Sequence, residues 1–484
     1  MIHPNELIID NFAGGGGAST GIETALKPLG RHVDIAVNHC VSAIDMHTLN
    51  HPKTKHLCES AFDVDPVKEC NGRPVGYGWF SPDCRHFSKA KGNKPVNKFI
   101  RGLAWLTVKW GALVPMRIFN LENVEEFLTW GPLIETKPGK FKPCPDRKGE
   151  TFNGFVKALT TGLELSHPAW KDLNASLFRC NYDLKQKLTI FKAVKNGLGY
   201  VIDHQLLAAH DYGVPTSRKR LFMVGRNDGL PVAFPKPTHG PKDSGLLPYR
   251  TAAEIIDWSL PVRSIFDPSR KKPVAEKSLK RIAKGVERYV VNAQDPFFVS
   301  PEKLVPFITE HANGSSQRNM ALNEPMRTLC AQVKGGHFAV VACSVIKFRG
   351  DNVGHEVKEP LHTISAGGNH LGLVQAYLVK YYGSGGANSL KMPLDTISTR
   401  DRFGLIVIKG EKYQIADIGM RMLQPHELFA AMGFPASYIT SHNSHGKKNS
   451  KAVQVARCGN AVCPPVAAAL VAANVFIEQD RIAA

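Results

Sequence analysis

The chain has 484 residues, which is too many for one compact core, so we expect two domains and allow for a third. Its 43% hydrophobic and 21% charged residues fit a soluble globular protein, and the absence of a long apolar run or a targeting pattern predicts a cytoplasmic protein with no membrane partner. The net charge of +19 favours a polyanionic partner such as nucleic acid, although a generally basic soluble protein has the same balance.

Residues 1–226 alternate short apolar runs, which predict strands, with helical stretches. The predicted strands are residues 7–12, 33–38, 75–80, 116–124, 199–209 and 220–225. This alternation is typical of an α/β domain whose mostly parallel sheet is covered on both faces. Functional side chains of such folds gather at the carboxyl ends of the strands. The candidates at or just past these runs are Asp10, Asp63, Cys84 and Glu122.

The rest of the chain changes character twice. A polar insertion at about 131–190 predicts some helix and suggests no function. Residues 227–414 begin with a proline- and glycine-rich stretch and contain weak repeats around Pro325, Pro360 and Pro393, which predict a β-rich second domain. A basic helix expected at 270–290 contacts DNA or is simply solvated. Residues 415–484 return to α/β texture and are predicted to pack on the first domain.

Three features of the first domain carry chemistry. The glycine cluster Gly14–Gly17 ends a predicted strand and enters a helix, so it approaches a nucleotide-like ligand or merely reverses the chain. Glu122 is a strand-end carboxylate, which caps a helix or is a surface charge unless other groups converge on it. Arg218 and Arg220 alternate on one strand face, either as solvent-facing cations or as donors to a planar oxygen-bearing group. Ten cysteines without a C-x-x-C pair argue against zinc and predict no metal site.

Together these features resemble the DNA cytosine-5 methyltransferases. Six motifs follow the family's order along nearly the whole chain, namely DNFAGGGGASTG (S-adenosylmethionine loop), PDCRHFS (nucleophile), LENV, VPTSRKR (for Q-x-R-x-R), RMLQPHELFAAMGFP and RCGNAVCPP. The resemblance implies a Rossmann-like methyltransferase domain, residues 1–226 with 415–484, interrupted by a smaller target recognition domain, residues 227–414. It covers neither the insertion nor the details of the second domain.

The sequence departs from the family's motifs at four positions. Asp83 precedes Cys84 and Arg85 follows it, whereas the family has Pro-Cys-Gln; the carboxylate raises a thiol pKa and the guanidinium lowers it. Thr216 replaces the glutamine near the arginines. His39 occupies the position of the acid that holds the cofactor ribose, so the cofactor is expected to be held differently.

The resemblance implies an S-adenosylmethionine-dependent DNA cytosine-5 methyltransferase of the restriction-modification type. It would methylate C5 of a cytosine flipped out of a specific duplex sequence, through a covalent bond from Cys84 to C6. Glu122 would bind N3 and the exocyclic amine, and Arg220, with Arg218 beside it, would hold O2. The residues implied for the cofactor are Phe12, Ala13, Gly14, Gly16, Gly17, His39, Asp63 and Asn460. Asp65 is a possible competitor for the role of Asp63.

The loop after Cys84 is basic and contains no acid, so we expect it to close over the phosphates around the flipped base, with a solvated loop as the alternative. Its cations are Arg85, Lys89, Lys91, Lys94, Lys98 and Arg101. An RNA cytosine-5 methyltransferase needs the same core residues, and a non-catalytic DNA-binding relic of the fold is a third interpretation. We expect a monomer acting on double-stranded DNA.

Overall fold

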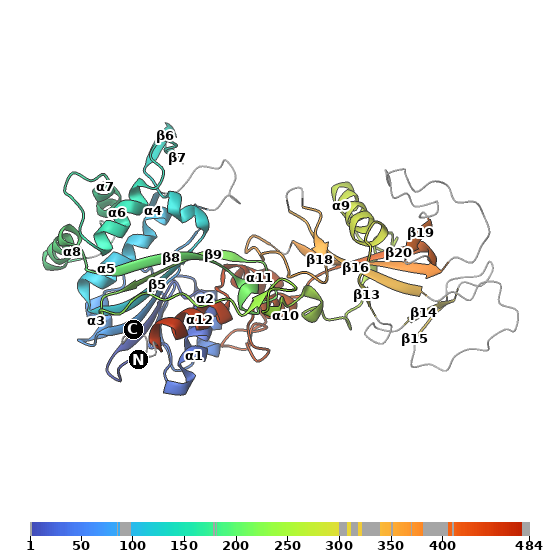
Figure 1. Ribbon diagram of the computed structural model, residues 1–484, viewed down its shortest axis with the longest axis horizontal. Helices are drawn as coiled ribbons and strands as arrows, with labels where there is room; N and C mark the ends of the chain where they lie inside the picture. Colours follow the sequence, from blue (N-terminus) through green and yellow to red (C-terminus); the bar gives the residue numbers. More distant parts are fainter. Residues whose placement is uncertain are drawn as a thin grey trace, which may run out of the picture. The chain divides into compact units, whose positions relative to one another are not determined.

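The computed structural model describes residues 2–84, 86–87, 98–177, 180, 182–299, 307–310, 318–321, 339–349, 352–368, 370–380, 405–408 and 411–476. These residues form two compact units (Figure 1). Unit 1 comprises Met1–Tyr249 and Met432–Ala484, and unit 2 comprises Arg250–Ala431.

Unit 1 is built on a seven-stranded sheet with the order β3-β2-β1-β4-β5-β9-β8 among the described residues. The strands are β1 (Leu7–Asn11), β2 (Ile35–Val37), β3 (Lys55–Leu57), β4 (Val75–Phe80), β5 (Met116–Asn123), β8 (Val201–Ala208) and β9 (Lys219–Arg226). The first five strands are parallel to one another, and β9 runs antiparallel to β5 and β8. The order reverses after β1, which is the switch point where ligands bind in open α/β sheets.

Helices cover both faces of this sheet, as Figure 1 shows. On one face α1 (Gly17–Leu26) packs against α12 (Pro464–Val475), so the C-terminal segment returns to unit 1. The other face carries α5 (Trp105–Leu113), α6 (Glu150–Leu159), α7 (Ala169–Leu177) and α8 (Leu184–Asn196). Trp105, Trp130 and Phe155 join the strand residues in one buried cluster. The insertion is therefore part of the core of unit 1.

Unit 1 contains further helices and two two-stranded pairs. They are α2 (Val41–Asn50), α3 (Pro66–Cys70), α4 (Lys98–Arg101), α11 (Lys451–Asn460), and the two-stranded pairs β6 (Leu133–Lys137) with β7 (Lys140–Pro143) and β10 (His239–Gly240) with β11 (Leu247–Pro248).

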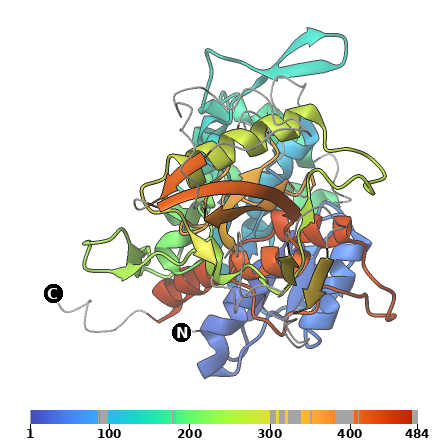
Figure 2. The ribbon, with the colours of Figure 1, turned by 90° about the vertical axis from the view of Figure 1, so that its right-hand side faces the viewer.

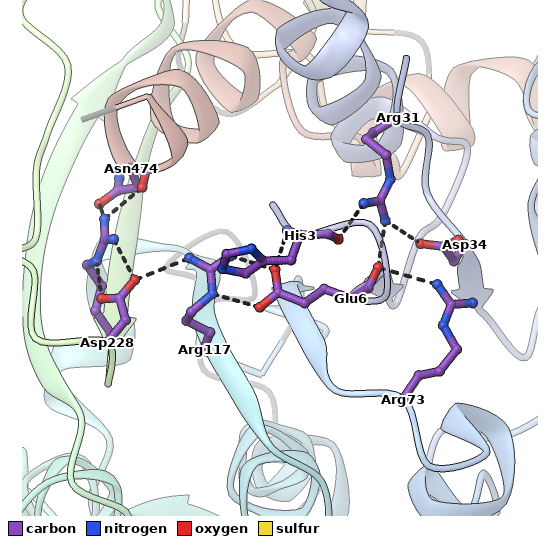
Figure 3. A network of polar contacts seen from close by, with 9 residues as sticks. His3, Glu6, Arg31, Asp34, Arg73, Arg117, Asp228 and Asn474 are labelled. Atoms are coloured by element: carbon purple, nitrogen blue, oxygen red, sulfur yellow. Dashed lines mark hydrogen bonds and ion pairs between the residues drawn. The ribbon is translucent and has the colours of Figure 1, made fainter. Parts of the chain in front are cut away.

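Ion pairs hold the amino edge of the sheet together (Figure 3). The Glu6 carboxylate, just before β1, pairs with Arg117 of β5 at 2.6 Å, and Arg117 also pairs with Asp228 at 3.3 Å. Arg226 donates to Asp228 and to the backbone oxygen of Asn474 in α12. Because the parallel strands β1 and β5 start at this edge, their carboxyl ends open at the opposite one.

Unit 2 is rich in β structure. Its main sheet has the order β12-β20-β18-β16-β13, with antiparallel neighbours. Its strands are β12 (Arg263–Ser264), β13 (Phe298–Val299), β16 (Ala339–Lys347), β17 (His355–Glu356), β18 (Leu371–Lys380), β19 (Leu405–Ile408) and β20 (Glu411–Met422), beside a separate pair, β14 (Phe307–Glu310) and β15 (Arg318–Ala321).

The described residues of unit 2 include the α-helices α9 (Glu276–Val286) and α10 (Pro425–Ala431). The amphipathic helix α9 lies along one face of the main sheet (Figure 2), with Ile282 and Val286 in the unit's core. The predicted basic helix is therefore formed, and its apolar side packs on the sheet. Most residues of the predicted repeats around Pro325 and Pro393 lie outside the described residues.

The unit boundaries differ from the predicted domain limits of 226/227 and 414/415. Residues 227–249 stay with unit 1 because the Tyr212 hydroxyl donates to the Pro235 backbone oxygen at 2.9 Å and the Tyr249 hydroxyl donates to Asp211 at 3.1 Å. Residues up to 431 stay with unit 2 because β20 pairs with β18 and the Arg421 guanidinium pairs with the buried Glu427 carboxylate at 2.7 Å.

One stretch of the described residues, Lys451–Val475, is long and apolar enough to cross a membrane by length and composition alone. In the fold, 67% of its most apolar window is buried inside the protein, as in a core helix. It contains α11 and α12, and α12 packs on α1.

Candidate active site

Cys84 and Glu122 lie at the carboxyl ends of two neighbouring parallel strands. Cys84 follows β4, and Glu122 is the penultimate residue of β5. The two strands pair as far as Phe80 and Leu121, which brings their ends together. The Asn123 amide then donates to the Pro82 backbone oxygen at 3.1 Å and ties the segment before Cys84 to β5. The structure therefore places the predicted nucleophile beside the predicted acid.

Arg220 joins this pair because β9 runs antiparallel to β5. Phe222 lies opposite Glu122, so the start of β9 lies at the end of β5. The Arg220 Nε atom is 3.3 Å from Glu122 Oε1, and both side chains are mostly buried. Other functional groups thus converge on Glu122, as a role beyond a helix cap requires. The interpretation of Arg220 as a solvent-facing cation is wrong.

Arg218 occupies a different position from Arg220. It is buried and donates to the Gly459 backbone oxygen at 3.2 Å, at the end of α11. It therefore links the start of β9 to the C-terminal motif. Thr216, at the position of the family's glutamine, is fully buried and its hydroxyl has no hydrogen-bond partner among the described residues.

The groups around Cys84 shift the pKa of its thiol in opposite directions. Burial raises the pKa of the thiol, the Glu122 carboxylate raises it further, and Arg220 and Arg218 lower it. Asp83 raises the pKa of Cys84 least of these groups. The sequence neighbour thus matters less than the residues that β5 and β9 bring in, and the net direction is upward.

The glycine loop after β1 turns through left-handed backbone. Phe12, Gly14 and Gly16 have φ of 67°, 57° and 87°. A Cβ on Gly14 would have the Phe12 backbone oxygen as its nearest neighbour, at 3.8 Å, so the loop is open there. The Ala13 N–H donates to the Val37 backbone oxygen at 3.1 Å and anchors the loop to β2. The loop thus leaves room for a ligand at Gly14.

Gly17 has a packing role in this structure. A Cβ at this position would lie 2.2 Å from the Val462 backbone oxygen, just before α12. Together with Gly21, whose Cβ would lie 2.4 Å from the Pro464 oxygen, Gly17 lets α1 approach the C-terminal segment closely. Gly17 was predicted from the sequence only as a cofactor residue, so this packing contact was not predicted.

Replacement of Gly17 by alanine is expected to lower the free energy of unfolding by about 1–3 kcal/mol, because the methyl group overpacks the contact with Val462. Gly367→Ala is the matched control, since a Cβ there meets no atom within 4 Å. Urea denaturation of both variants measures the difference. Equal stability of the two variants would rule out the packing role.

The other predicted cofactor residues follow strands at the same edge of the sheet. His39 comes just after β2 and Asp63 comes after β3; both side chains are exposed, as is Asn460 at the end of α11. Asp65 accepts from the Val67 N–H at 2.9 Å and caps α3. Because Asp65 has this structural partner, Asp63 remains the stronger candidate for a ligand contact.

A buried polar chain beneath the glycine loop was not predicted as a unit. The Ser19 hydroxyl donates to Asp10 at 2.7 Å and lies 2.9 Å from His47, and His47 lies 2.8 Å from His56. Asp10, although at a strand end, is fully buried and therefore supports the fold. Only the spacing of Ser19 and His47 on two helices facing β1 could have indicated this arrangement.

Tyr438 supports the loop from the C-terminal segment. Its hydroxyl donates to the Gly15 backbone oxygen at 2.5 Å. A Cβ on Gly16 would lie 2.2 Å from the same hydroxyl, so Gly16 must lack a side chain. No sequence pattern joins positions so far apart in the chain.

Asp10 makes stability depend on pH. Burial raises its pKa to about 7 from an ordinary 3.8, so its contribution to stability is full below pH 3.8 and is lost as the pH rises through 7. Between pH 5 and pH 8 the ionisation of Asp10 is expected to lower the unfolding free energy of the wild type by about 3 kcal/mol, and Asp10→Asn should not show this decrease. Urea denaturation at both pH values tests this, with the exposed Asp243→Asn as control. An unchanged pH profile in Asp10→Asn would contradict the prediction.

The DNA-contact residues predicted after the nucleophile, Arg85, Lys89, Lys91 and Lys94, lie outside the described residues. Arg101, at the far end of this loop, is buried; it donates to the Gly131 backbone oxygen at 3.1 Å and lies over the Phe87 ring at 4.5 Å. The expectation that Arg101 contacts phosphate is therefore wrong, because this guanidinium is part of the fold. Among the described residues, no cluster of three or more metal-binding side chains is present.

Known proteins are similar to the chain in sequence, and solved structures align with most of it. Type II methyltransferase M.XorII of Xanthomonas oryzae pv. oryzae is 28% identical over 243 residues, covering 48% of this chain and 43% of that protein. Type II methyltransferase M.SacI of Streptomyces achromogenes is 25% identical over 242 residues, covering 48% and 50%. The chain therefore spans about half the length of the curated relatives it matches. The S. pombe Dnmt2 methyltransferase structure aligns over 96% of this chain and 97% of its own, with 12% identity and a TM-score of 0.45.

The family match extends through both units. Residues 180–475 match the C-5 cytosine-specific DNA methylases. This range includes Arg218, Arg220, the whole of unit 2 and the returning helices α11 and α12. Because it takes in more than half of the chain, the protein belongs to the C-5 cytosine-specific DNA methylase family.

Proposed function

We propose that this protein is a DNA cytosine-5 methyltransferase that uses S-adenosylmethionine and acts through Cys84. The observation that carries the proposal is the convergence of a thiol, a carboxylate and a guanidinium from three strand ends. Glu122 and Arg220 are 3.3 Å apart, and both alter the pKa of Cys84. Covalent addition to cytosine requires these three groups: a nucleophile for C6, a proton for N3 and a cation for O2.

The loop and the strand ends around β1 suit S-adenosylmethionine. The backbone is open at Gly14, and the exposed Asp63 and His39 offer an acceptor for an amine and a partner for a hydroxyl. When bound, this cofactor supplies an electrophilic methyl group. Phe12, Ala13, Gly16 and Asn460 would complete the site, while Gly17 would contribute by placing α1.

The proposed mechanism needs Cys84 as thiolate and a proton on Glu122 to give to N3. The ionised Glu122 raises the pKa of the thiol, and the thiol is a reactive nucleophile only as thiolate. A proton on Glu122 removes that opposing charge and leaves Arg218 and Arg220 to stabilise the thiolate. The state with protonated Glu122 and ionised Cys84 is therefore the reactive one, and it holds the proton where N3 needs it.

Bond changes follow from that state. The Cys84 sulfur forms a bond to C6 while Glu122 gives its proton to N3 and Arg220 binds O2. The ring becomes an enamine with an electron pair at C5. That pair would take the methyl group supplied by S-adenosylmethionine, which would leave as the thioether S-adenosylhomocysteine. A base then removes the C5 proton, the electrons return to the ring and the bond from sulfur to C6 breaks. Cys84 and Glu122 end as they began, after the proton on N3 returns.

The target base has to leave the double helix, because stacking covers C6 and pairing occupies N3. Unit 2, with its own core and the cationic helix α9, is proposed to read the target sequence. The net charge of +19 supports binding to duplex DNA. We further propose that the protein acts as a cytoplasmic monomer.

A mechanism-based trap tests the proposal. Duplex DNA containing 5-fluorocytosine, given with S-adenosylmethionine, is expected to leave a permanent protein–DNA adduct, because fluorine at C5 cannot be removed as a proton. Denaturing electrophoresis detects the adduct, and peptide mapping should place it on Cys84. Absence of the adduct across a library of duplex sequences would overturn the covalent mechanism.

Labelled methyl transfer to duplex DNA, tRNA and free dCMP separates the alternative substrates. Transfer to duplex DNA alone is the expected result. Transfer to tRNA alone would identify an RNA methyltransferase, and DNA binding without transfer would identify a non-catalytic protein.

A further inference from the structure

We propose that Lys109 is a positioning residue for the cofactor site, whose buried ammonium group holds the turn that presents Asp63. This inference rests on the proposed use of S-adenosylmethionine. Lys109 lies on α5, on the sheet face opposite α1, and belongs to none of the six motifs.

The Lys109 side chain is fully buried and makes three hydrogen bonds with one turn. Its Nζ atom donates to the backbone oxygens of Ala61, Phe62 and Val64 at 3.2, 3.1 and 2.5 Å. An ammonium group has three N–H donors, so all of them are used. One side chain thus holds the backbone on both sides of Asp63.

Core burial of Ala61, Phe62 and Val64 and short backbone contacts also hold this turn between β3 and α3. The Asp63 and Val64 N–H groups donate to the Ser60 backbone oxygen at 2.8 and 3.3 Å, and Asp65 caps α3. The carbonyl oxygens on this turn point the other way, into the protein, where Lys109 binds them. Within the described residues the Asp63 carboxylate is exposed and has no hydrogen-bond partner. The backbone is therefore fixed while the carboxylate stays available to a ligand.

Packing alone does not explain a lysine at this position. No described carboxylate forms an ion pair with Lys109, and burial lowers the pKa of its amine to about 8. Burying a cation without a paired anion costs stability, and methionine has a similar shape without that cost. We therefore explain the lysine by its three hydrogen bonds to the turn that contains Asp63.

Two variants test the proposal, Lys109→Met and the milder Lys109→Gln. The dissociation constant for S-adenosylhomocysteine, measured by calorimetry, is expected to rise by about tenfold or more in Lys109→Met, because small misplacements of a contact weaken it strongly. The KM for the cofactor should rise in parallel, with kcat at saturating cofactor and the KM for DNA unchanged. Lys68→Met, which removes an exposed lysine from α3, is the matched control and should bind as the wild type.

A double-mutant cycle with Asp63→Asn shows whether Lys109 acts through Asp63. In the Asp63→Asn background, Lys109→Met is expected to change the dissociation constant by less than about twofold. An equal loss in both backgrounds would overturn the proposal, as would wild-type binding by the folded Lys109 variants.

Circular dichroism establishes that each variant is folded. If neither Lys109 variant folds, Lys109 is a determinant of the whole fold and the positioning proposal fails. A wild-type protein that binds no S-adenosylhomocysteine would instead overturn the proposed function, so the two failures are distinguishable.

Discussion

Replacement of Cys84 by alanine is expected to abolish methyl transfer to duplex DNA, with a loss on the order of 10³-fold or more in kcat. The reason is that Cys84 is the proposed nucleophile for C6, whereas Glu122 and Arg220 are proposed to act on N3 and O2. Labelled methyl transfer at saturating cofactor and DNA measures the effect. The 5-fluorocytosine adduct should disappear in the same variant.

The binding functions should survive this change. Cys84 is half-buried, and its side chain carries no hydrogen bond of the fold among the described residues, so DNA affinity and unfolding free energy are expected to remain near the wild-type values. Cys58→Ala is the matched control, since Cys58 is exposed and lies outside the cluster. Substantial methyl transfer by Cys84→Ala would exclude the covalent mechanism.

Replacement of Glu122 by glutamine is expected to lower kcat by about 10²- to 10⁴-fold while making Cys84 easier to ionise. Glutamine cannot give a proton to N3, so the enamine forms slowly. It also removes the charge that raises the pKa of the Cys84 thiol, and Arg220 and Arg218 then lower that pKa without opposition. The substitution should therefore lower the rate of methyl transfer while it raises the reactivity of the Cys84 thiol.

The rate of Cys84 alkylation by iodoacetamide, followed across pH by peptide mapping, separates the effects. The midpoint for Cys84 should move to lower pH in Glu122→Gln, since the thiolate forms more readily. Glu125→Gln, at an exposed position just after β5, should change neither alkylation nor methyl transfer. An upward shift of the midpoint in Glu122→Gln would show that the carboxylate does not oppose the thiolate.

The sequence alone determined the fold class and the sheet edge at which Cys84 and Glu122 lie. Apolar runs of strand length alternate with helical periodicity, so an α/β sheet was predictable, and polar residues just past those runs had to gather at one edge. Cys84 and Glu122 were therefore expected to lie together at that edge. The motif order added the family, which the match of residues 180–475 confirms.

Only the tertiary structure decided which side chains touch. The antiparallel entry of β9 sets Arg220 against Glu122 and turns Arg218 toward Gly459, although alternation along one strand suggested equivalent roles. Likewise, nothing local distinguishes the buried Lys109 and Arg101 from solvated cations.

These differences have one physical reason. Periodicity reports how each segment partitions between water and core, and it is a local property. Hydrogen bonds between Lys109 and the Ala61–Val64 turn, or between Tyr438 and Gly15, depend on strand order and helix packing across long stretches of chain. Strand order and packing arise from the whole fold, so the chemistry of single side chains becomes readable only there.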